Sequence, residues 1–180
     1  MVICGLDESG RGPLAGPIVA SAVILHRPIT GLNDSKKLKS HQREYLFEKI
    51  YQSGTVAVET ISVELINTHG IGWANKELFL RLMKELVADK HIVDGNLKIT
   101  GADSVVRADE KIPEVMAASI IAKVTRDRLM ETLDKQFPAY YWRTNKGYGT
   151  KQHILSLHQH GISLHHRRAF VDTALQKNKI

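Results

Sequence analysis

The first 25 residues constrain the fold most, because two apolar segments flank a turn that is rich in glycine and proline. Residues 2–7 and 17–25 each predict a buried strand, and the turn between them covers residues 9–16. Asp7 and Glu8 stand where the first strand gives way to the turn. We therefore expect a strand hairpin that presents two carboxylates beside a flexible backbone.

The remainder of the chain alternates helical and strand patterns without a repeat or an interdomain linker. Ser40 is a candidate N-cap for a helix over 40–52 that Gly54 ends. The other expected segments, in chain order, are a strand over 55–63, a helix over 63–87 interrupted near 69–72, a strand over 91–95, one or two strands over 97–106, a helix over 113–137, a basic loop over 140–151, and helices over 152–160 and 168–176. This order predicts an α/β fold with a mixed sheet and helices on both of its faces.

The composition is that of a water-soluble domain. With 180 residues, 43% of them apolar, the chain can build one well-buried core. Its apolar runs are shorter than the roughly 20 residues that a membrane helix needs, and its beginning shows no export signal. Cys4 is the only cysteine, which excludes a disulfide within the chain and fits a cytoplasmic protein. A formal net charge of +6 favours a polyanionic partner.

The acids gather at Asp7, Glu8 and over 94–109, whereas lysines and arginines dominate several other segments. An acidic spot among basic patches suits a metal-dependent enzyme that acts on nucleic acid. Two-metal nucleases hold their ions with carboxylates, and the segments that carry Asp7, Asp94 and Asp109 could converge. Because neighbouring residues of a strand face opposite sides, Asp7 and Glu8 share a site only if the chain bends at Glu8.

Most of these acids also have a simpler explanation. Asp109 could cap the helix that follows it, and Asp94 could belong to an ordinary turn. Glu8 could form a surface ion pair with Arg11. Only the pair Asp7 and Glu8, placed between a buried strand and a glycine turn, resists a purely structural interpretation.

The glycine turn matches neither common nucleotide-binding motif. From Gly10 to Gly16 its spacing is G-x-G-x-x-x-G, and no Gly-Lys-Ser/Thr follows. One use of such a turn is to bring backbone groups against a sugar or phosphate, with Arg11 as a charged donor. The alternative, a tight hairpin turn without a ligand, stays equally open on the sequence alone.

Two further groups of polar residues carry weaker signals. Four histidines near the C-terminus have no cysteine nearby, and their spacing matches no usual zinc motif: His158, His160, His165 and His166. Arg126 and Asp127 are expected to pair with each other or to cap local structure.

Six segments, in the same order, make the chain similar to a known family: GLDESGRGPLAGPIVASAVIL (5–25), NDSKKL (33–38), IVDGN (92–96), AASIIAKVTRDRLM (117–130), KGYGT (146–150) and HRRAF (166–170). The chain resembles bacterial ribonuclease HII, the type 2 ribonucleases H. The resemblance implies a ribonuclease H-like fold, with a central mixed β-sheet flanked by helices and a helical C-terminal extension. It divides a single compact unit into a catalytic part over 1–138 and an extension over 139–180 that contributes to substrate binding.

The resemblance also implies an activity and a set of catalytic acids. The family degrades RNA in RNA–DNA hybrids and incises duplex DNA on the 5′ side of a single embedded ribonucleotide, leaving 3′-hydroxyl and 5′-phosphate ends. Its four acidic residues, which hold two Mg²⁺ or Mn²⁺ ions, fall on Asp7, Glu8, Asp94 and Asp109. Where the family usually has Gly-Asp, this chain has Ala108-Asp109, so Glu110 and Asp103 stay as alternatives to Asp109.

The substrate-binding residues that the resemblance implies are Gly10, Arg11, Gly12, Ser35, Lys36 and Tyr148. The first three match a motif that reads the ribose 2′-hydroxyl through the backbone, and Tyr148 matches a tyrosine that contacts the sugar. On the residues alone, Tyr148 could also be a structural aromatic on a glycine-rich loop, although Gly147 and Gly149 beside it suit an exposed contact residue better. His166 and Arg167 match a motif whose role we expect to be structural support. The expected partners are RNA–DNA hybrids and DNA duplexes containing ribonucleotides, bound by a monomer with no membrane contact and no evident protein partner.

Two other classes of function stay open. A different nuclease on the same fold would share the acids but lack the ribose-reading residues. A non-catalytic nucleic-acid-binding module would suffer from acids near phosphate unless metal were present.

Overall fold

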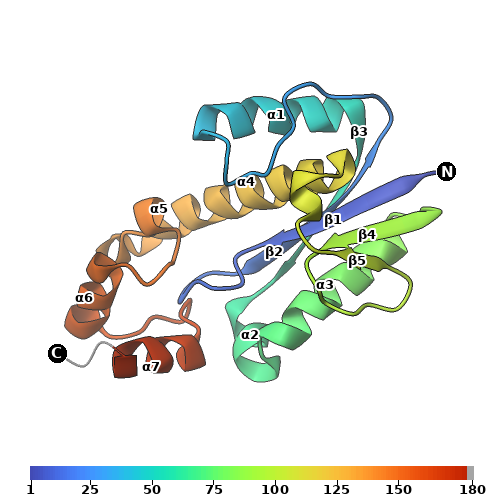
Figure 1. Ribbon diagram of the computed structural model, residues 1–180. Coiled ribbons are helices and arrows are strands. Elements are labelled where there is room, and N and C mark those ends of the chain that lie inside the picture. Colours follow the sequence, from blue (N-terminus) through green and yellow to red (C-terminus); the bar gives the residue numbers. More distant parts are fainter. Residues whose placement is uncertain (178–180) are drawn as a thin grey trace.

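The computed structural model describes residues 1–177, and within that range no helix combines the length and apolar character that crossing a membrane requires. Figure 1 shows the elements along the chain. They are β1 (Ile3–Ser9), β2 (Ile18–Leu25), α1 (Ser40–Ser53), β3 (Gly54–Ile61), α2 (Val63–His69), α3 (Ile71–Glu85), β4 (Lys90–Asp94), β5 (Asp103–Val105), the 3₁₀ turn η1 (Ala108–Glu110), α4 (Pro113–Gln136), η2 (Pro138–Tyr140), α5 (Trp142–Asn145), α6 (Lys151–His160) and α7 (Arg168–Lys177).

The five strands form one mixed sheet in the order β3-β2-β1-β4-β5. β1 pairs antiparallel with β2 and β2 antiparallel with β3, whereas β1–β4 and β4–β5 are parallel pairs. The expected opening hairpin is therefore confirmed, and β1 is the central strand. A central strand has a neighbour on each side, which makes its end a fixed point for functional groups.

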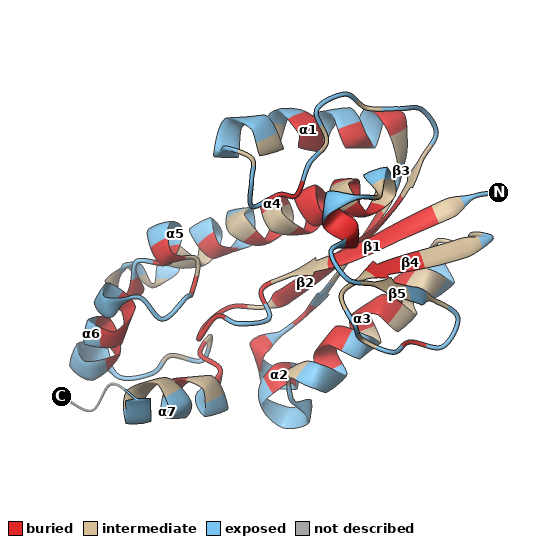
Figure 2. Cartoon of the chain, viewed as in Figure 1, coloured by how far each residue is buried: buried red, intermediate tan, exposed pale blue. Residues whose placement is uncertain are grey.

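Helices cover both faces of the sheet, as expected (Figure 1). On one face α1 and α4 pack together, with Phe47 and Ile50 against Ile120 and Ile121. On the other face α3 contributes Leu78, Phe79 and Leu82 to a cluster with residues of β1 and β2. Figure 2 shows the buried residues concentrated where the helices face the strands.

The helix α4 lies unusually close to β1, and its sequence explains why. Pro113 occupies its first turn, where a missing N–H costs nothing. Ala117 and Ala118 are fully buried small residues. A Cβ added to Gly5 of β1 would sit 2.2 Å from the backbone carbon of Glu114, so only glycine allows this approach.

The C-terminal elements have their own core, which also takes in part of the glycine turn. Trp142 is fully buried and packs with Leu14, Ala15 and Met130. The turn that follows β1 is thus held against α5 and α6 as well as against the sheet. Residues 178–180 of the expected extension lie outside the described residues.

Two local expectations are wrong, one at the start of α1 and one in the basic loop. Ser40 is the first residue of α1 and Lys39 is its N-cap, whose backbone N–H donates to the Gln42 side chain at 2.8 Å. Of the one or two strands expected over 97–106, the structure has one, Asp103–Val105. The expected basic loop over 140–151 contains the short helix Trp142–Asn145, whose tryptophan is needed in the core.

Candidate active site

Asp7 and Asp94 lie side by side at the ends of two parallel strands. The register pairs Leu6 of β1 with Val93 of β4, so the next residue of each strand is an aspartate on the face that α4 covers. Asp7 is 5% exposed. Two carboxylates from distant parts of the chain therefore meet at one buried sheet end.

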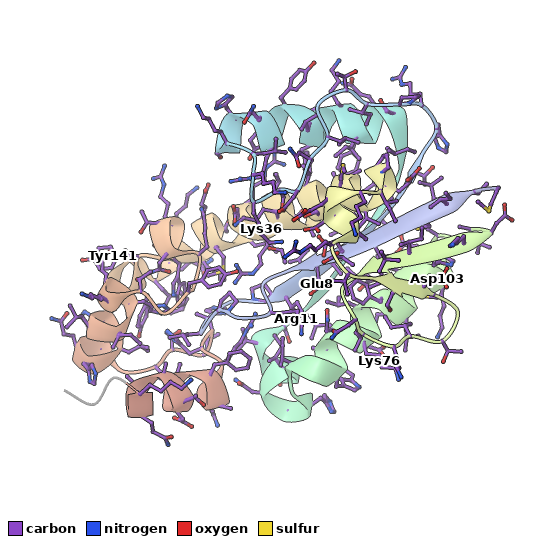
Figure 3. All side chains as sticks on the ribbon, in the orientation of Figure 1. Glu8, Arg11, Lys36, Lys76, Asp103 and Tyr141 are labelled. Atoms are coloured by element: carbon purple, nitrogen blue, oxygen red, sulfur yellow. The ribbon has the colours of Figure 1, made fainter. Side chains whose placement is uncertain are left out.

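Glu8 joins them without the expected bend. β1 stays in register with β2 through Ser9, so the prediction of a bend at Glu8 is wrong. β4 ends at Asp94 and leaves this edge of β1 open, and the Glu8 N–H donates to Asp7 Oδ1 at 2.7 Å. Figure 3 shows Glu8 at this end of the sheet, near Arg11.

Asp109 is brought to the same place by Asp94. The Ala108 N–H donates to Asp94 Oδ1 at 2.7 Å, which fixes η1 beside the end of β4. Asp109 is 4% exposed, and its Oδ2 lies 3.2 Å from Lys36 Nζ. It does not cap α4, whose N-cap is Ile112 with no side-chain hydrogen bond. The simpler explanations of Asp94 and Asp109 are therefore not what the structure shows.

The two alternatives to Asp109 are engaged elsewhere. Glu110 pairs with Lys37 at 3.3 Å. Asp103 is exposed at the start of β5 and pairs with Lys90 at 2.9 Å. This arrangement favours Asp109 as the fourth acid of the cluster.

The four acids, Asp7, Glu8, Asp94 and Asp109, are named here the acid cluster, and they repel one another. Burial raises the pKa of Asp7 well above its ordinary value, and the charges of Glu8 and Asp94 raise it further. Burial also raises the pKa of Glu8, against the opposing effect of Arg11. The pKa of Asp109 is raised by burial and by Asp94. The cluster therefore holds more negative charge than its surroundings neutralise.

The acid cluster suits a divalent cation. Glu8 Oε2 is buried and has no hydrogen-bond partner, which a buried charged oxygen rarely tolerates unless something else binds it. Carboxylate oxygens are the ligands that Mg²⁺ and Mn²⁺ prefer. Within residues 1–177, no three Asp, Glu, His or Cys side chains already converge as a metal site. Arg11 and Lys36 form ion pairs with Glu8 and Asp109 of the cluster.

The sequence did not reveal that Ser119 belongs to this site. Ser119 of α4 is 3% exposed and hydrogen-bonds to the Asp7 carboxylate. Its Oγ lies 2.8 Å from Ser35 Oγ, so Ser35 is also buried and reaches Asp7 only through Ser119. A serine inside the otherwise apolar run AASIIA is the signal that could have indicated it.

The residues expected to read the sugar surround one side of the acid cluster. Gly10 has a φ of 98°, and Arg11 and Gly12 after it are exposed. Tyr148 is 46% exposed, and a Cβ added to Gly12 would lie 3.8 Å from its ring. Lys36 has a side chain that is 74% exposed. The turn, the ring and the acids thus share one surface.

The expected pairing of Arg126 with Asp127 is wrong. Arg126 is fully buried and donates to the backbone carbonyls of Ala15, Pro17 and Lys146. Asp127 pairs with Lys123 at 2.6 Å. The sequence holds a usable signal, because Ala122, Arg126 and Met130 recur at the four-residue spacing of a buried helix face.

The buried histidine His166 is committed to protein partners. Its Nδ1 accepts a hydrogen bond from the Ser163 N–H at 2.9 Å, which leaves the proton on Nε2, 3.1 Å from His153 Nε2. His153 Nε2 also accepts from the Trp142 indole, so the proton of His153 sits on Nδ1 and is donated to the Tyr148 carbonyl. Both rings are neutral in this arrangement, and burial lowers the pKa of each.

The curated relatives described here match this chain over most of their length and share one name. A family model described as Ribonuclease HII matches residues 4–173. Ribonuclease HII of Magnetococcus marinus is 46% identical over 93% of this chain and 84% of its own length. Ribonuclease HII of Rickettsia rickettsii is 45% identical over 94% of this chain and 91% of its own length.

Solved structures show the same fold. The ribonuclease HII in a PCNA complex from Archaeoglobus fulgidus has a TM-score of 0.83 and 28% identity, covering 93% of this chain and 94% of that one. Ribonuclease H2 from Pyrococcus horikoshii has a TM-score of 0.81 and 26% identity, covering 98% of each chain. Bst-RNase HIII in complex with Mn²⁺, at 20% identity and a TM-score of 0.73, covers 99% of this chain and 70% of that one and shows the fold alone. The chain is a ribonuclease H and belongs to the ribonuclease HII family.

Proposed function

We propose that this ribonuclease degrades RNA in RNA–DNA hybrids and also incises duplex DNA on the 5′ side of a single embedded ribonucleotide. The products are a 3′-hydroxyl and a 5′-phosphate. One observation carries the proposal: a buried acid cluster with an unpartnered carboxylate oxygen lies beside an exposed glycine turn and the Tyr148 ring. The acids supply the chemistry of cutting, and the turn and ring supply a way to distinguish ribose from deoxyribose.

The acid cluster divides the work of holding ions. Asp7 and Asp94 are the main ligands, because they sit at the fixed ends of the two central parallel strands. Glu8 and Asp109 complete the set from either side. Two Mg²⁺ or Mn²⁺ ions bound there would lower the pKa of the attacking water and neutralise charge on the scissile phosphate.

The residues around the cluster place the substrate. The Arg11 guanidinium lies 3.4 Å from Glu8 Oε1, so the turn that reads the sugar touches the group that holds metal. Lys36 contacts Asp109 through a mostly exposed side chain and can turn to a phosphate of the substrate. Ser35 supports the site through Ser119 and Asp7.

The C-terminal extension over 139–180 takes part in binding because it carries Tyr148. Gly147 accepts a hydrogen bond from the Leu14 N–H at 2.8 Å, which connects the extension directly to the glycine turn. The relative from Archaeoglobus was solved in complex with PCNA. A relative that assembles with another protein counts against the expectation that this chain acts without protein partners.

The test is cleavage of a DNA duplex that contains one ribonucleotide, together with an RNA–DNA hybrid and an all-DNA duplex of the same sequence. We expect the first two to be cut in Mg²⁺ or Mn²⁺, and cutting to stop in excess chelator. Mapping the ends should place the break on the 5′ side of the ribose.

The other two classes of function predict different results. A general nuclease on this fold would cut the all-DNA duplex equally well. A nucleic-acid-binding module would bind all three duplexes and cut none of them with either metal.

A further inference from the structure

Two buried arginines lie beneath the glycine turn, and neither forms a salt bridge with an acid among residues 1–177. Arg126 and Arg167 are each fully buried. Burial and the neighbouring charge of Arg126 lower the pKa of Arg167 to about 9. Placing two like charges side by side in the interior is costly, so their hydrogen bonds must supply a specific arrangement.

All of those hydrogen bonds go to backbone carbonyls of the turn and of the Tyr148 loop. Arg167 donates to Gly10 at 2.7 Å, to Arg11 at 3.0 Å and to Gly16 at 2.8 and 3.0 Å. Arg126 donates to Pro17 and Lys146 at 3.0 Å and to Ala15 at 3.2 Å. The carbonyls of both segments therefore point inward, toward the guanidinium groups.

The direction of a carbonyl fixes the direction of the next N–H. In a trans peptide the C=O and the following N–H point in opposite directions. Because Arg167 draws the carbonyls of Gly10 and Arg11 inward, the N–H groups of Arg11 and Gly12 face outward. Within residues 1–177, neither N–H donates to another protein group, and both residues are exposed.

We propose that Arg167, supported by Arg126, is a positioning residue for sugar selection, which it performs by turning the Arg11 and Gly12 N–H groups toward the ribose. The inference rests on the proposed function, and it assigns that selectivity to a residue that touches no substrate. Arg126 adds a second connection, because it joins the turn to Lys146, two residues before Tyr148. The backbone donors and the aromatic ring are thereby held at a fixed separation.

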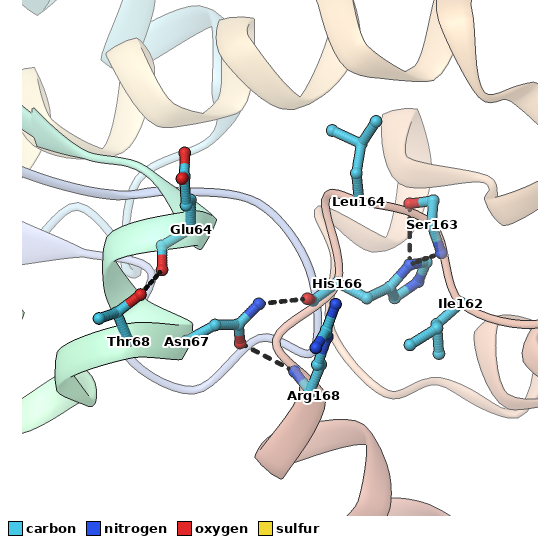
Figure 4. A pocket seen from close by; sticks show the side chains of 8 residues that line it. All are labelled: Glu64, Asn67, Thr68, Ile162, Ser163, Leu164, His166 and Arg168. Atoms are coloured by element: carbon cyan, nitrogen blue, oxygen red, sulfur yellow. Dashed lines mark hydrogen bonds between the residues drawn. The ribbon is translucent and has the colours of Figure 1, made fainter.

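Arg167 is itself held in place by α2, which lies on the face of the sheet opposite to α4. Figure 4 shows Asn67 of α2 at the edge of a cavity of about 640 Å³, bonded to the residues on either side of Arg167. Its Nδ2 donates to the His166 carbonyl at 3.1 Å, and its Oδ1 accepts from the Arg168 N–H at 3.0 Å. The Arg167 N–H donates to the Leu14 carbonyl at 2.8 Å. The helix α2 thus takes part in holding the turn.

The experiment measures binding rather than cutting. Dissociation constants are determined in excess chelator for a DNA duplex with one ribonucleotide and for the all-DNA duplex. Their ratio is the discrimination factor. In Arg167→Lys the charge remains but the fork that holds several carbonyls is lost. We expect the discrimination factor to fall about tenfold, the scale of one lost hydrogen bond to the sugar, with less than about a twofold change for all-DNA.

Arg168→Lys is the matched control, because it makes the same change at the next residue, whose side chain is exposed at the cavity. It should leave both dissociation constants unchanged within about twofold. If Arg167→Lys does not fold, Asn67→Asp decides, because it removes the donor to His166 and keeps the acceptor for Arg168. We expect a smaller loss of discrimination there, about threefold.

The outcomes separate the two proposals. A folded Arg167→Lys, or Asn67→Asp in its place, that keeps the wild-type discrimination factor overturns the positioning role. A wild-type protein that binds both duplexes equally also overturns it, because no selection in binding is then left to position, whereas the proposed function fails only if the cleavage test shows no preference for ribonucleotides.

Discussion

Two regions of this molecule bury like charges side by side, and they differ in what satisfies them. In the acid cluster the pKa values of Asp7, Glu8 and Asp109 are raised, and Glu8 Oε2 has no hydrogen-bond partner. Beneath the glycine turn, the guanidinium groups of Arg126 and Arg167 donate to backbone carbonyls throughout. The acid cluster lacks a partner for Glu8 Oε2, and that partner must come from outside the protein, whereas the hydrogen bonds of the two arginines are satisfied within it.

This difference separates chemistry from positioning. The carboxylates of the acid cluster repel one another, and a bound cation relieves that repulsion. The acid cluster is therefore suited to binding a cation. A complete set of hydrogen bonds fixes one geometry, so the arginines are built to hold the backbone still. The two regions meet where Arg11 of the turn contacts Glu8 of the cluster.

The largest expected effect comes from Asp7→Asn. Asp7 lies at the centre of the acid cluster, so its loss should lower kcat more than about 1,000-fold, beyond what removing one neutral hydrogen-bond donor from an active site costs. In chelator the variant should be more stable than wild type, by about 1 kcal/mol, because it removes one of the repelling charges. Single-turnover cleavage and urea unfolding measure the two effects.

Asp103→Asn is the control, because it changes an exposed acid of β5 that pairs with Lys90 outside the cluster. It should change neither quantity by more than about twofold or 0.5 kcal/mol. Wild-type turnover in Asp7→Asn would remove Asp7 from the mechanism. A less stable Asp7→Asn would contradict the stored repulsion.

The glycine turn should be sensitive at Gly10 and tolerant at Gly12. Alanine at position 10 meets a φ of 98° and places a Cβ 2.0 Å from Arg126 Nε, a side chain fixed by its own hydrogen bonds. We expect a loss of about 2–4 kcal/mol in the free energy of unfolding. At Gly12 the nearest atom to a Cβ is 3.8 Å away, so alanine should cost less than about 0.5 kcal/mol. Equal losses in the two variants would show that the arginines do not fix the turn.

Asp7 of the acid cluster and His166, the residue before Arg167, should respond to acid in opposite directions. Burial, together with His153, lowers the pKa of His166 from 6.5 to about 4. Its neutral form stabilises the fold fully above pH 6.5, and that stability is lost as the pH falls toward 4, up to about 3 kcal/mol, because the unfolded chain binds the proton first. The raised pKa of Asp7 acts the other way, since protonation relieves repulsion as the pH falls.

Urea unfolding at a series of pH values between 7 and 4 tests this opposition. His166→Gln should lose less stability on acidification than wild type does, and Asp7→Asn should lose more. If both variants shift the pH profile in the same direction, the assignment of the two responses is incorrect.

The architecture could be predicted from the sequence because it depends on local pattern, whereas the set of four acids came from the resemblance to ribonuclease HII. Apolar runs around a glycine turn specify the hairpin, and acids at strand ends specify where carboxylates meet. The bend expected at Glu8 does not occur. β4 stops at Asp94, so the edge of β1 beside Glu8 is open and no bend is needed there. Where a neighbouring strand ends is a property of the sheet and cannot be read from β1 itself.

The residues that the sequence concealed act across long separations. In the sequence Ser119 resembles a packing residue, and only the fold places Ser35 and Asp7 beside it. Arg126 and Arg167 bind carbonyl groups, and every residue has one, so no side-chain pattern marks their acceptors. Contacts with the backbone are therefore the part of a site that only the folded chain reveals.

The smallest expected effect is that of Lys36→Met, which tests whether a lysine side chain of the protein serves the acid cluster as a counter-ion. Lys36 lies 3.2 Å from Asp109, but three quarters of its side chain is exposed, so the pair should contribute less than about 1 kcal/mol to stability. Its larger role would be at a phosphate of the substrate. Loss of one phosphate contact should lower the slope of log K against log salt by about 1 and weaken hybrid and all-DNA binding alike. An unchanged slope, with Lys37→Met as the control, would leave Lys36 as a counter-ion of Asp109 that compensates the acid cluster and takes no part in binding the substrate.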